Sequence, residues 1–281
     1  MSDKIQTIDF LSPNAGKQFV DSLHHTGFAI LHNHQIDFNL INDVYNDWET
    51  FFSSKEKHSY TFNPNTQDGY FPYRCENAKG YNAKDLKEFY HFYEWGKYPK
   101  NISGKTKRLY YELLAIGRIL LVWINANTPK MSLINSSVSL PEMIENSRRN
   151  LMRIIHYPPL KSNITDGAIR AAAHGDINLI TILPAASQPG LQVQIKENKW
   201  LDVNCNPGWL VINTGDMLQE CSEGYYPSTI HRVVNPKDKH AHLSRYSIPL
   251  FIHPRDEVIL SKRYSAKKYL DERLHEIGLK S

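Results

Sequence analysis

The first part of the chain carries apolar residues at helical spacing. Ser12 and Pro13 predict the start of a first helix and Gly27 its end, because proline fits a first turn and glycine fits a helix C-terminus. Asp37 is expected to cap a second helix, whose apolar positions recur every three or four residues. A long helix is predicted from about Ser103. This half of the chain is therefore expected to be mostly helical.

Three segments interrupt that helical pattern. Phe28–Leu31 has the composition of a short buried strand. Residues 60–82, rich in Asn, Pro, Gly and Tyr, are expected to form a loop. The aromatic run Phe89–Tyr93 is expected to be a half-buried strand and not a substrate cage.

From Asn150 onward the pattern changes to short apolar runs separated by Pro, Gly, Asn and Asp, which is typical of a β-barrel or sandwich. The runs are residues 151–157, 171–174, 179–183, 191–195, 209–213, 229–234 and 244–253. An amphipathic helix from Ser265 to about Gly278 follows. Because no Pro/Gly linker separates the two regimes, we predict one domain over residues 1–281. It comprises a mostly helical region (1–149), a β core (150–255) and a segment with the C-terminal helix (256–281).

Composition narrows the class of protein. The 281 residues are 41% hydrophobic and 22% charged, which is enough apolar material for a core without disulfides. A net charge of +4, with no block of like charge, gives no indication of a nucleic-acid partner. The sequence shows neither a signal peptide nor an apolar run near the ~20 residues of a membrane span. The three cysteines (Cys75, Cys205 and Cys221) do not suggest a disulfide framework, so we expect a cytoplasmic protein.

Candidate metal chemistry centres on His174 and Asp176. In extended backbone, side chains two residues apart point to the same side, so both can reach one ion. His231 lies in a later strand-like run. Two histidines and one carboxylate form the facial triad of non-haem Fe(II) oxygenases, which leaves coordination positions open for substrate atoms and dioxygen. We therefore predict His174, Asp176 and His231 as metal ligands and catalytic residues.

Arg245 and Ser247 provide a candidate anion site in the next predicted strand, with both side chains on one face. A guanidinium fork suits bidentate binding of a carboxylate, and a hydroxyl two residues on can donate a further hydrogen bond.

Longer segments support a family resemblance. Gly190–Val193 and Trp200–Val203 look like a pair of core strands, and Asn213–Asp216 and His231–Val233 follow in order. In the N-terminal half the matching segments are Ile8–Phe10, Gly27–Phe28, Asn33–His34, Phe51–Phe52, Glu56–Lys57, Gly69–Tyr70 and Lys87–Glu88. With these motifs the chain resembles, over nearly its whole length, the iron-dependent dioxygenases typified by isopenicillin N synthase and the plant 2-oxoglutarate oxygenases.

That resemblance implies a mainly β fold with flanking helices (α+β), whose core is a double-stranded β-helix, or jelly roll. It implies His174, Asp176 and His231 as iron ligands and Arg245 and Ser247 as the pair that binds the distal carboxylate of 2-oxoglutarate. Tyr157, within the segment 156–159, matches a family tyrosine that also contacts this cosubstrate. The implied reaction is oxidation of a small molecule by O2 with Fe(II) and 2-oxoglutarate, releasing succinate and CO2, and ascorbate can serve as an added reductant.

Three alternatives stay open. An oxidase of the same fold can keep the Arg-x-Ser pair without using 2-oxoglutarate, and a catalytically silent member could bind metal or ligand as a sensor. A zinc hydrolase with the same ligands gives no reason for Arg245 and Ser247. For the prime substrate, a small molecule, the candidate contacts are Tyr70, Arg74 and Phe251, because their segments are expected to approach the mouth of the barrel.

Overall fold

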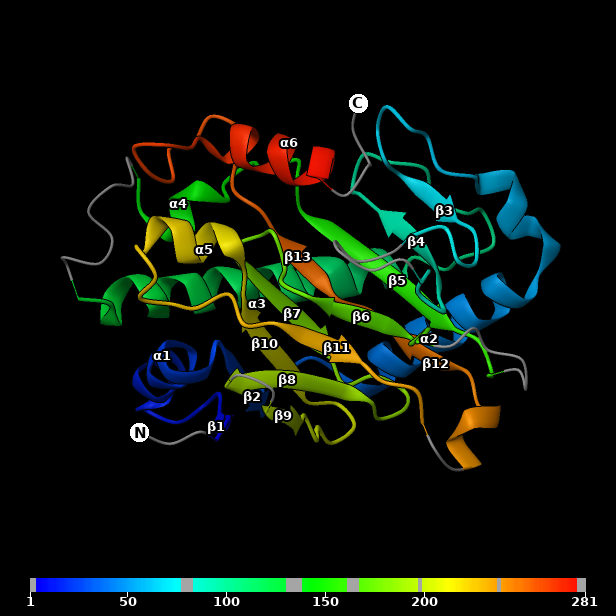
Figure 1. Ribbon diagram of the computed structural model, residues 1–281, viewed down its shortest axis with the longest axis horizontal. Coiled ribbons are helices and arrows are strands. Elements are labelled where there is room, and N and C mark those ends of the chain that lie inside the picture. Colours follow the sequence, from blue (N-terminus) through cyan, green and yellow to red (C-terminus); the bar gives the residue numbers. More distant parts are fainter. Residues whose placement is uncertain are drawn as a thin grey trace.

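Two facing β-sheets form the centre of the molecule (Figure 1). The computed structural model describes residues 4–76, 83–129, 138–160, 167–196, 199–236 and 239–276. The major sheet runs in the order β1 (Gln6–Asp9), β2 (Phe28–His32), β10 (Leu210–Thr214), β7 (Ile180–Pro184), β13 (Leu250–Ile252), β5 (Leu151–Tyr157), β4 (Glu88–Phe92) and β3 (Gly69–Phe71), with β12 (Arg245–Ser247) also paired to β5. The minor sheet runs in the order β6 (Ala171–His174), β11 (His231–Val233), β8 (Leu191–Lys196) and β9 (Lys199–Asp202). This is the predicted jelly roll.

Helices cover the other face of the major sheet. The three long ones are α1 (Ala15–Thr26), α2 (Phe38–Ser53) and α3 (Lys105–Asn127), and α3 packs against both α1 and α2 and against strands β7 and β13. The shorter elements are α4 (Leu140–Met143), α5 (Asp216–Cys221), α6 (Ala266–Glu276) and the 3-10 helices η1 (Lys55–Tyr60) and η3 (Lys239–His242). The result is three layers: helices, major sheet and minor sheet (Figure 1).

Strand alternation divides the apolar residues between two cores. In β2, Phe28 and Ile30 belong to the core between the sheets, whereas Ala29 and Leu31 belong to the core beneath the helices. A strand buried on both faces has no polar side, which explains why this segment reads as a continuous apolar run. The major sheet is thus a rigid floor for the space between the sheets.

The predicted strands are largely confirmed, with three corrections. β5 and β6 have the predicted bounds, but residues 244–253 form two strands, β12 and β13, separated at Pro249, which has no N–H for a ladder. The predicted loop 60–82 contains a three-residue strand, β3, which pairs with β4. The local composition of this segment does not reveal the pairing. β4 is buried at all five positions instead of half-buried, because it lies between β5 and β3 in the major sheet. The region 1–149 thus contributes strands β1 to β4 as well as helices.

The helix signals are confirmed in most cases. Asp37 caps α2, and its Oδ1 accepts a hydrogen bond from the backbone N–H of Asn39 at 2.8 Å. α1 begins at Ala15 instead of Ser12, since the residues between form a turn in which the carbonyl of Ser12 accepts from the N–H of Ala15. α6 confirms the C-terminal helix, and its predicted end, Gly278, lies outside the described residues.

Gly27 ends α1 in the left-handed conformation, with φ of 70°. A Cβ at this position would lie 2.3 Å from Oγ1 of Thr229 and 2.6 Å from the carbonyl oxygen of Pro227.

Gly224 is a matched control for a substitution of Gly27, because its φ is +83° but no atom of the described residues lies within 4 Å of the point that a Cβ would occupy. We expect Gly27→Ala to lower the free energy of unfolding by about 1–3 kcal/mol more than Gly224→Ala, measured by urea denaturation. Equal losses would show that the close approach to Thr229 and Pro227 contributes nothing.

α3 is long and apolar enough, with a mean hydropathy of 1.4, to cross a membrane by length and composition alone, contrary to the expectation from the sequence. In this fold one face of α3 lies in the core beneath the major sheet; its buried residues include Leu109, Leu113, Ile116, Leu120 and Ile124. Ile119 and Val122 are exposed.

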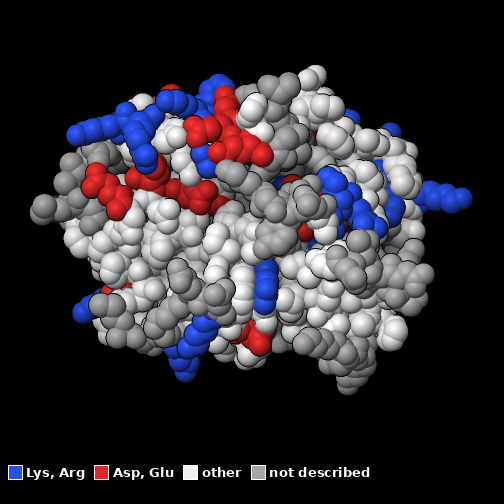
Figure 2. All heavy atoms as spheres, viewed as in Figure 1, with Lys and Arg blue, Asp and Glu red and all other residues white. Residues whose placement is uncertain are grey.

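On the surface shown in Figure 2, acidic side chains gather near α5 and α6, next to basic ones, so both signs of charge share that face.

Candidate active site

The two histidines of the predicted triad are direct neighbours across the minor sheet. In the antiparallel ladder between β6 and β11, His174 is the register partner of His231. Opposed residues on antiparallel strands have close Cβ atoms, and the two imidazole rings have centroids 4.5 Å apart. The register shifts just beyond this pair, as at a β-bulge, a feature common beside active sites.

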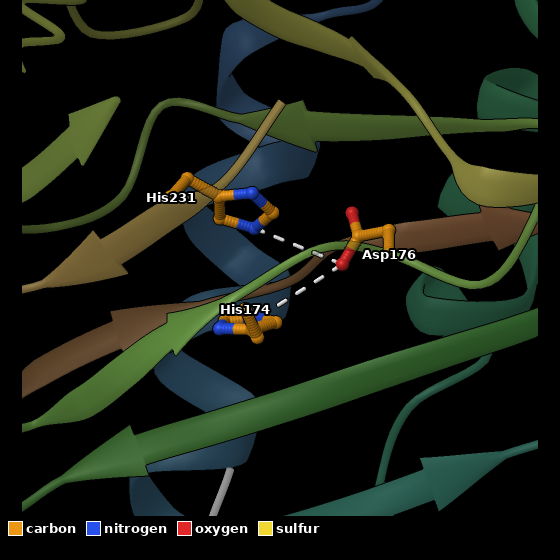
Figure 3. A group of neighbouring side chains, drawn as sticks. All are labelled: His174, Asp176 and His231. Carbon is orange, nitrogen blue, oxygen red and sulfur yellow. Dashed lines mark ion pairs between the residues drawn. The ribbon is translucent and has the colours of Figure 1, made fainter. Parts of the chain in front are cut away.

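Asp176 completes the cluster from the segment that follows β6 (Figure 3). Its Oδ1 lies 3.9 Å from Nε2 of His174 and 3.7 Å from Nε2 of His231. The three candidate ligand atoms lie within 4.8 Å of one another, and within the described part of the chain no fourth His, Cys, Asp or Glu joins the group. The arrangement has the composition of an open, three-ligand metal site.

Hydrogen bonds orient each of these donors. Nδ1 of His174 contacts the carbonyl of Ala172 at 2.7 Å, and Nδ1 of His231 contacts the carbonyl of Thr229 at 3.2 Å. Because a carbonyl only accepts, Nδ1 carries the proton in each neutral ring and Nε2 keeps its lone pair. Oδ2 of Asp176 accepts from Thr181 at 2.6 Å and from the Asn213 amide at 2.8 Å, which leaves Oδ1 for a metal.

The electrostatics favour the protonation states of His174 and Asp176 that a metal needs. Desolvation and the nearby His231 lower the pKa of His174 to about 4, so the imidazole is neutral at pH 7. Burial raises the pKa of Asp176, but the two histidines and the hydrogen bonds from Asn213 and Thr181 outweigh it and lower the pKa. A neutral His174 imidazole and an ionised Asp176 carboxylate are thus ready to bind a divalent cation.

Thr181 offers a test of this supporting shell. Its hydroxyl accepts from the Asn178 amide at 3.0 Å and donates to Asp176 at 2.6 Å. We expect Thr181→Val to weaken Fe(II) affinity by about 10-fold or more, because the carboxylate loses an orienting donor. Thr181→Ser keeps the hydroxyl and should bind iron like the parent chain in an anaerobic metal titration. If Val and Ser variants bound iron equally well, the hydroxyl would have no part in orienting Asp176.

The candidate anion site lies where β12 pairs with β5. Arg245 is the register partner of Tyr157, its guanidinium lies 5.1 Å from the centre of the Tyr157 ring, and its Nε donates to the carbonyl of Gln188 at 2.9 Å. Arg245 and Ser247 are 2% and 4% exposed, and Nη1 of Arg245 has no hydrogen-bond partner among the described residues. A buried guanidinium with a free N–H fits a bound carboxylate.

A cavity of about 620 Å³ opens beside the triad. Its wall includes His174, Asp176, Phe251 and His253, together with groups of both charges. Arg245, Ser247 and Tyr157 are not among the residues of this wall in the part of the chain that the structure describes. The space can hold a small molecule next to the candidate metal position.

A buried ion network forms the polar side of the cavity. Nζ of Lys87 lies 2.9 Å from Glu76 and 2.8 Å from Asp85. Arg153 donates to His91 at 2.9 Å and lies 3.3 Å from Glu76. Burial alone would raise the pKa of Glu76, but Arg153 and Lys87 outweigh it and hold the pKa well below the usual range. Glu76 is therefore ionised at neutral pH and paired with both Lys87 and Arg153.

Of the candidate substrate contacts, the structure places only Phe251 in the wall of this cavity. Tyr70 is 3% exposed and donates its hydroxyl to Glu88 instead. Arg74 is outside the described cavity wall as well. His156, which also contacts Glu88, is buried in the same cluster and does not line the cavity.

Sequence reasoning missed the supporting groups of the site. Thr181 carries no motif, and Lys87 and Asn213 belong to segments that support the family resemblance without a role attached to either residue. Arg170, a second fully buried arginine, was also missed, because a single basic residue before a strand is normally assigned to the solvent-exposed surface.

Comparisons with known proteins identify similar sequences and structures. The profile of the 2OG-Fe(II) oxygenase superfamily matches residues 149–254, and that of the non-haem dioxygenase in morphine synthesis N-terminal region matches residues 5–111. A solved structure from Shewanella oneidensis, assigned as an oxygenase, is 47% identical with a TM-score of 0.88, over 98% of this chain and 99% of that one. Flavonol synthase 1 from Crocosmia x crocosmiiflora is 26% identical over 85% of this chain and 75% of its own length.

Some curated relatives match over a shorter stretch. A 2-oxoglutarate-Fe(II) type oxidoreductase from Aspergillus fumigatus is 36% identical over 101 residues, which is 36% of this chain and 29% of that protein. The chain thus spans less than a third of that relative's length.

Proposed function

Because the chain belongs to the family of non-haem Fe(II)- and 2-oxoglutarate-dependent dioxygenases, we propose that it oxidises a small polar molecule. One O2 and one 2-oxoglutarate are consumed for each substrate oxidised; in a hydroxylation, one oxygen atom enters the product and the other enters succinate, and CO2 is released. The observation that carries the proposal is the open His174, Asp176 and His231 triad, of which His174 and Asp176 line the cavity; the buried Arg245, with an unpaired Nη1, supports it.

In this proposal His174, Asp176 and His231 hold Fe(II), which supplies the activation of O2 when bound. Thr181 and Asn213 fix the carboxylate so that Oδ1 faces the metal position. The remaining protein groups bind and orient ligands and exclude water, which is the protein's share in cofactor enzymes.

Arg245 and Ser247 are proposed to bind the distal carboxylate of 2-oxoglutarate, and the Tyr157 ring packs against the guanidinium. Carboxylate recognition by a guanidinium fork provides both charge and direction. The cosubstrate is thereby held in one orientation relative to the triad.

The prime substrate is proposed to be polar, because the cavity wall carries fixed charges of both signs, among them Lys87, Arg153 and Glu76. An apolar ligand would have to desolvate these groups without offering hydrogen bonds in return. Phe251 adds an apolar surface to the same wall, against which the carbon skeleton of such a substrate can pack.

The test is to load the purified chain with Fe(II) and 2-oxoglutarate under anaerobic conditions, admit O2, and measure succinate and CO2 with and without ascorbate. Polar metabolites are then screened for stimulation of succinate release, with His174→Ala as the inactive control. Succinate formation that depends on His174 supports the proposal. Oxidation of a substrate without succinate would favour the oxidase alternative, and binding of 2-oxoglutarate without turnover of any kind would favour the sensor.

A further inference from the structure

Arg170, which directly precedes β6, is a buried guanidinium that the proposed function leaves unused. It is 1% exposed. Its Nη2 donates to the carbonyl of Leu243 at 3.0 Å, whereas its Nε and Nη1 have no hydrogen-bond partner among the described residues. Buried N–H groups without an acceptor are costly and rare, so this pair of donors indicates an acceptor that comes from outside the chain.

A second unpaired guanidinium lies nearby. Arg245 follows Leu243 by two residues, and its Nη1 is also buried without a partner in the part of the chain that the structure describes. Burial and the positive charge of Arg245 lower the pKa of Arg170 to about 10, and Tyr157 is the other titratable group that acts on it. The geometry agrees, because Arg170 is hydrogen-bonded to the segment that leads into β12, and Arg245 on β12 pairs with Tyr157 on β5.

No carboxylate of the described residues acts on either guanidinium. The charged and titratable groups that act on Arg245 are Tyr157 and Tyr45, and Arg170 has only Arg245 and Tyr157. Neither guanidinium makes an ion pair with a described Asp or Glu, unlike the buried Lys87 with its two carboxylates. Two buried like charges destabilise the free chain, and a bound anion removes that penalty.

We propose that Arg170 binds the distal carboxylate of 2-oxoglutarate together with Arg245, as a second arginine outside the Arg-x-Ser pair. The inference rests on the proposed function and extends it to a residue that no motif identifies. A carboxylate has two oxygens with about four acceptor sites. Three of these sites can accept from the unpaired nitrogens, which are Nε and Nη1 of Arg170 and Nη1 of Arg245. The fourth can accept from the hydroxyl of Ser247. Two guanidinium groups also make the site more selective for a dicarboxylic 2-oxo acid than a single one would.

The test compares two ligands on one variant. 2-Oxoglutarate and 2-oxopentanoate share the chain length and the metal-binding end, but 2-oxopentanoate has a methyl group in place of the distal carboxylate. Both are titrated calorimetrically into chain loaded with Mn(II), a redox-inert substitute for iron. We expect Arg170→Met to weaken 2-oxoglutarate binding by about 10-fold or more and to leave 2-oxopentanoate binding unchanged.

Two further measurements separate ligand binding from a structural role. Arg118→Met, an exposed position on α3, is the matched control and should change neither affinity. The ligand-free Arg170→Met chain should melt at the same temperature as the parent or higher, because an unpaired buried charge has been replaced by an apolar side chain of similar length. If Arg170→Met does not fold, Arg170→Lys replaces it, with a smaller expected loss because the charge stays and the fork is lost.

Equal losses for the two ligands, or undiminished binding of 2-oxoglutarate to the variant, would overturn the role of Arg170. Failure of the parent chain itself to bind 2-oxoglutarate would overturn the proposed function as well. The two failures are thus distinguishable from the same set of titrations.

Discussion

Replacing either His174 or Asp176 with alanine is expected to abolish stoichiometric Fe(II) binding and all succinate formation. Each variant leaves two protein donors, and the lost donor cannot be replaced because no other described His, Cys, Asp or Glu reaches the cluster. Asp176→Ala carries a further penalty, since the Thr181 hydroxyl and the Asn213 amide lose their acceptor in a buried site. Iron per chain after anaerobic reconstitution is the primary measurement.

His25→Ala is a suitable control for this experiment, because His25 is exposed on α1 and its ring contacts the carbonyl of Asp21 in its own helix. It should bind iron like the parent chain. Full iron occupancy in His174→Ala or Asp176→Ala would refute the triad as the metal site.

The triad could be predicted from the sequence because its geometry is set by local rules. His174 and Asp176 are separated by one residue, so they stay close whatever the rest of the fold does. His231 is less constrained, and its position depends on the register of β11 against β6, which pairs it with His174. The sequence indicated a strand there but could not fix that register, which only the resemblance supplied.

The placement of the candidate anion-binding residues was predictable in part. Arg245 and Ser247 lie on one short strand, so their common face follows from the alternation of side chains. Arg170 directly precedes β6 of the other sheet, and only tertiary packing brings its guanidinium to the carbonyl of Leu243, two residues before Arg245. No local pattern marks such a residue, and its burial without a described acidic partner becomes visible only in the structure.

The polar side of the cavity was unpredictable for a similar reason. Lys87, Glu76 and Asp85 are near in sequence and would ordinarily be assigned to a solvated surface, whereas Arg153 reaches them from β5. Tyr70 shows the opposite error: its segment does approach the cavity region, but the side chain turns to Glu88. Segment positions can thus be inferred from order along the chain, while side-chain partners depend on strand pairing.

Replacing Arg245 with alanine is expected to weaken 2-oxoglutarate binding by about 10- to 150-fold, the equivalent of about 1.5–3 kcal/mol for a hydrogen bond to a charged group. The metal should still bind, because Arg245 lies outside the cluster of candidate ligands. The dissociation constant is measured from the absorbance of the anaerobic Fe(II) complex as 2-oxoglutarate is added, together with iron per chain.

A matched series shows which property of Arg245 matters. Arg245→Lys keeps a positive charge but loses the planar fork, so its affinity should lie between those of the parent and the alanine variant. Ser247→Ala removes a neutral hydroxyl and should cost less, about 0.5–1.5 kcal/mol. Since Arg245 is buried with an Nη1 that no described residue pairs, the ligand-free alanine variant should lose little stability, which separates binding from folding. Unchanged affinity in Arg245→Ala with normal iron content would refute the assignment of the distal carboxylate to this arginine.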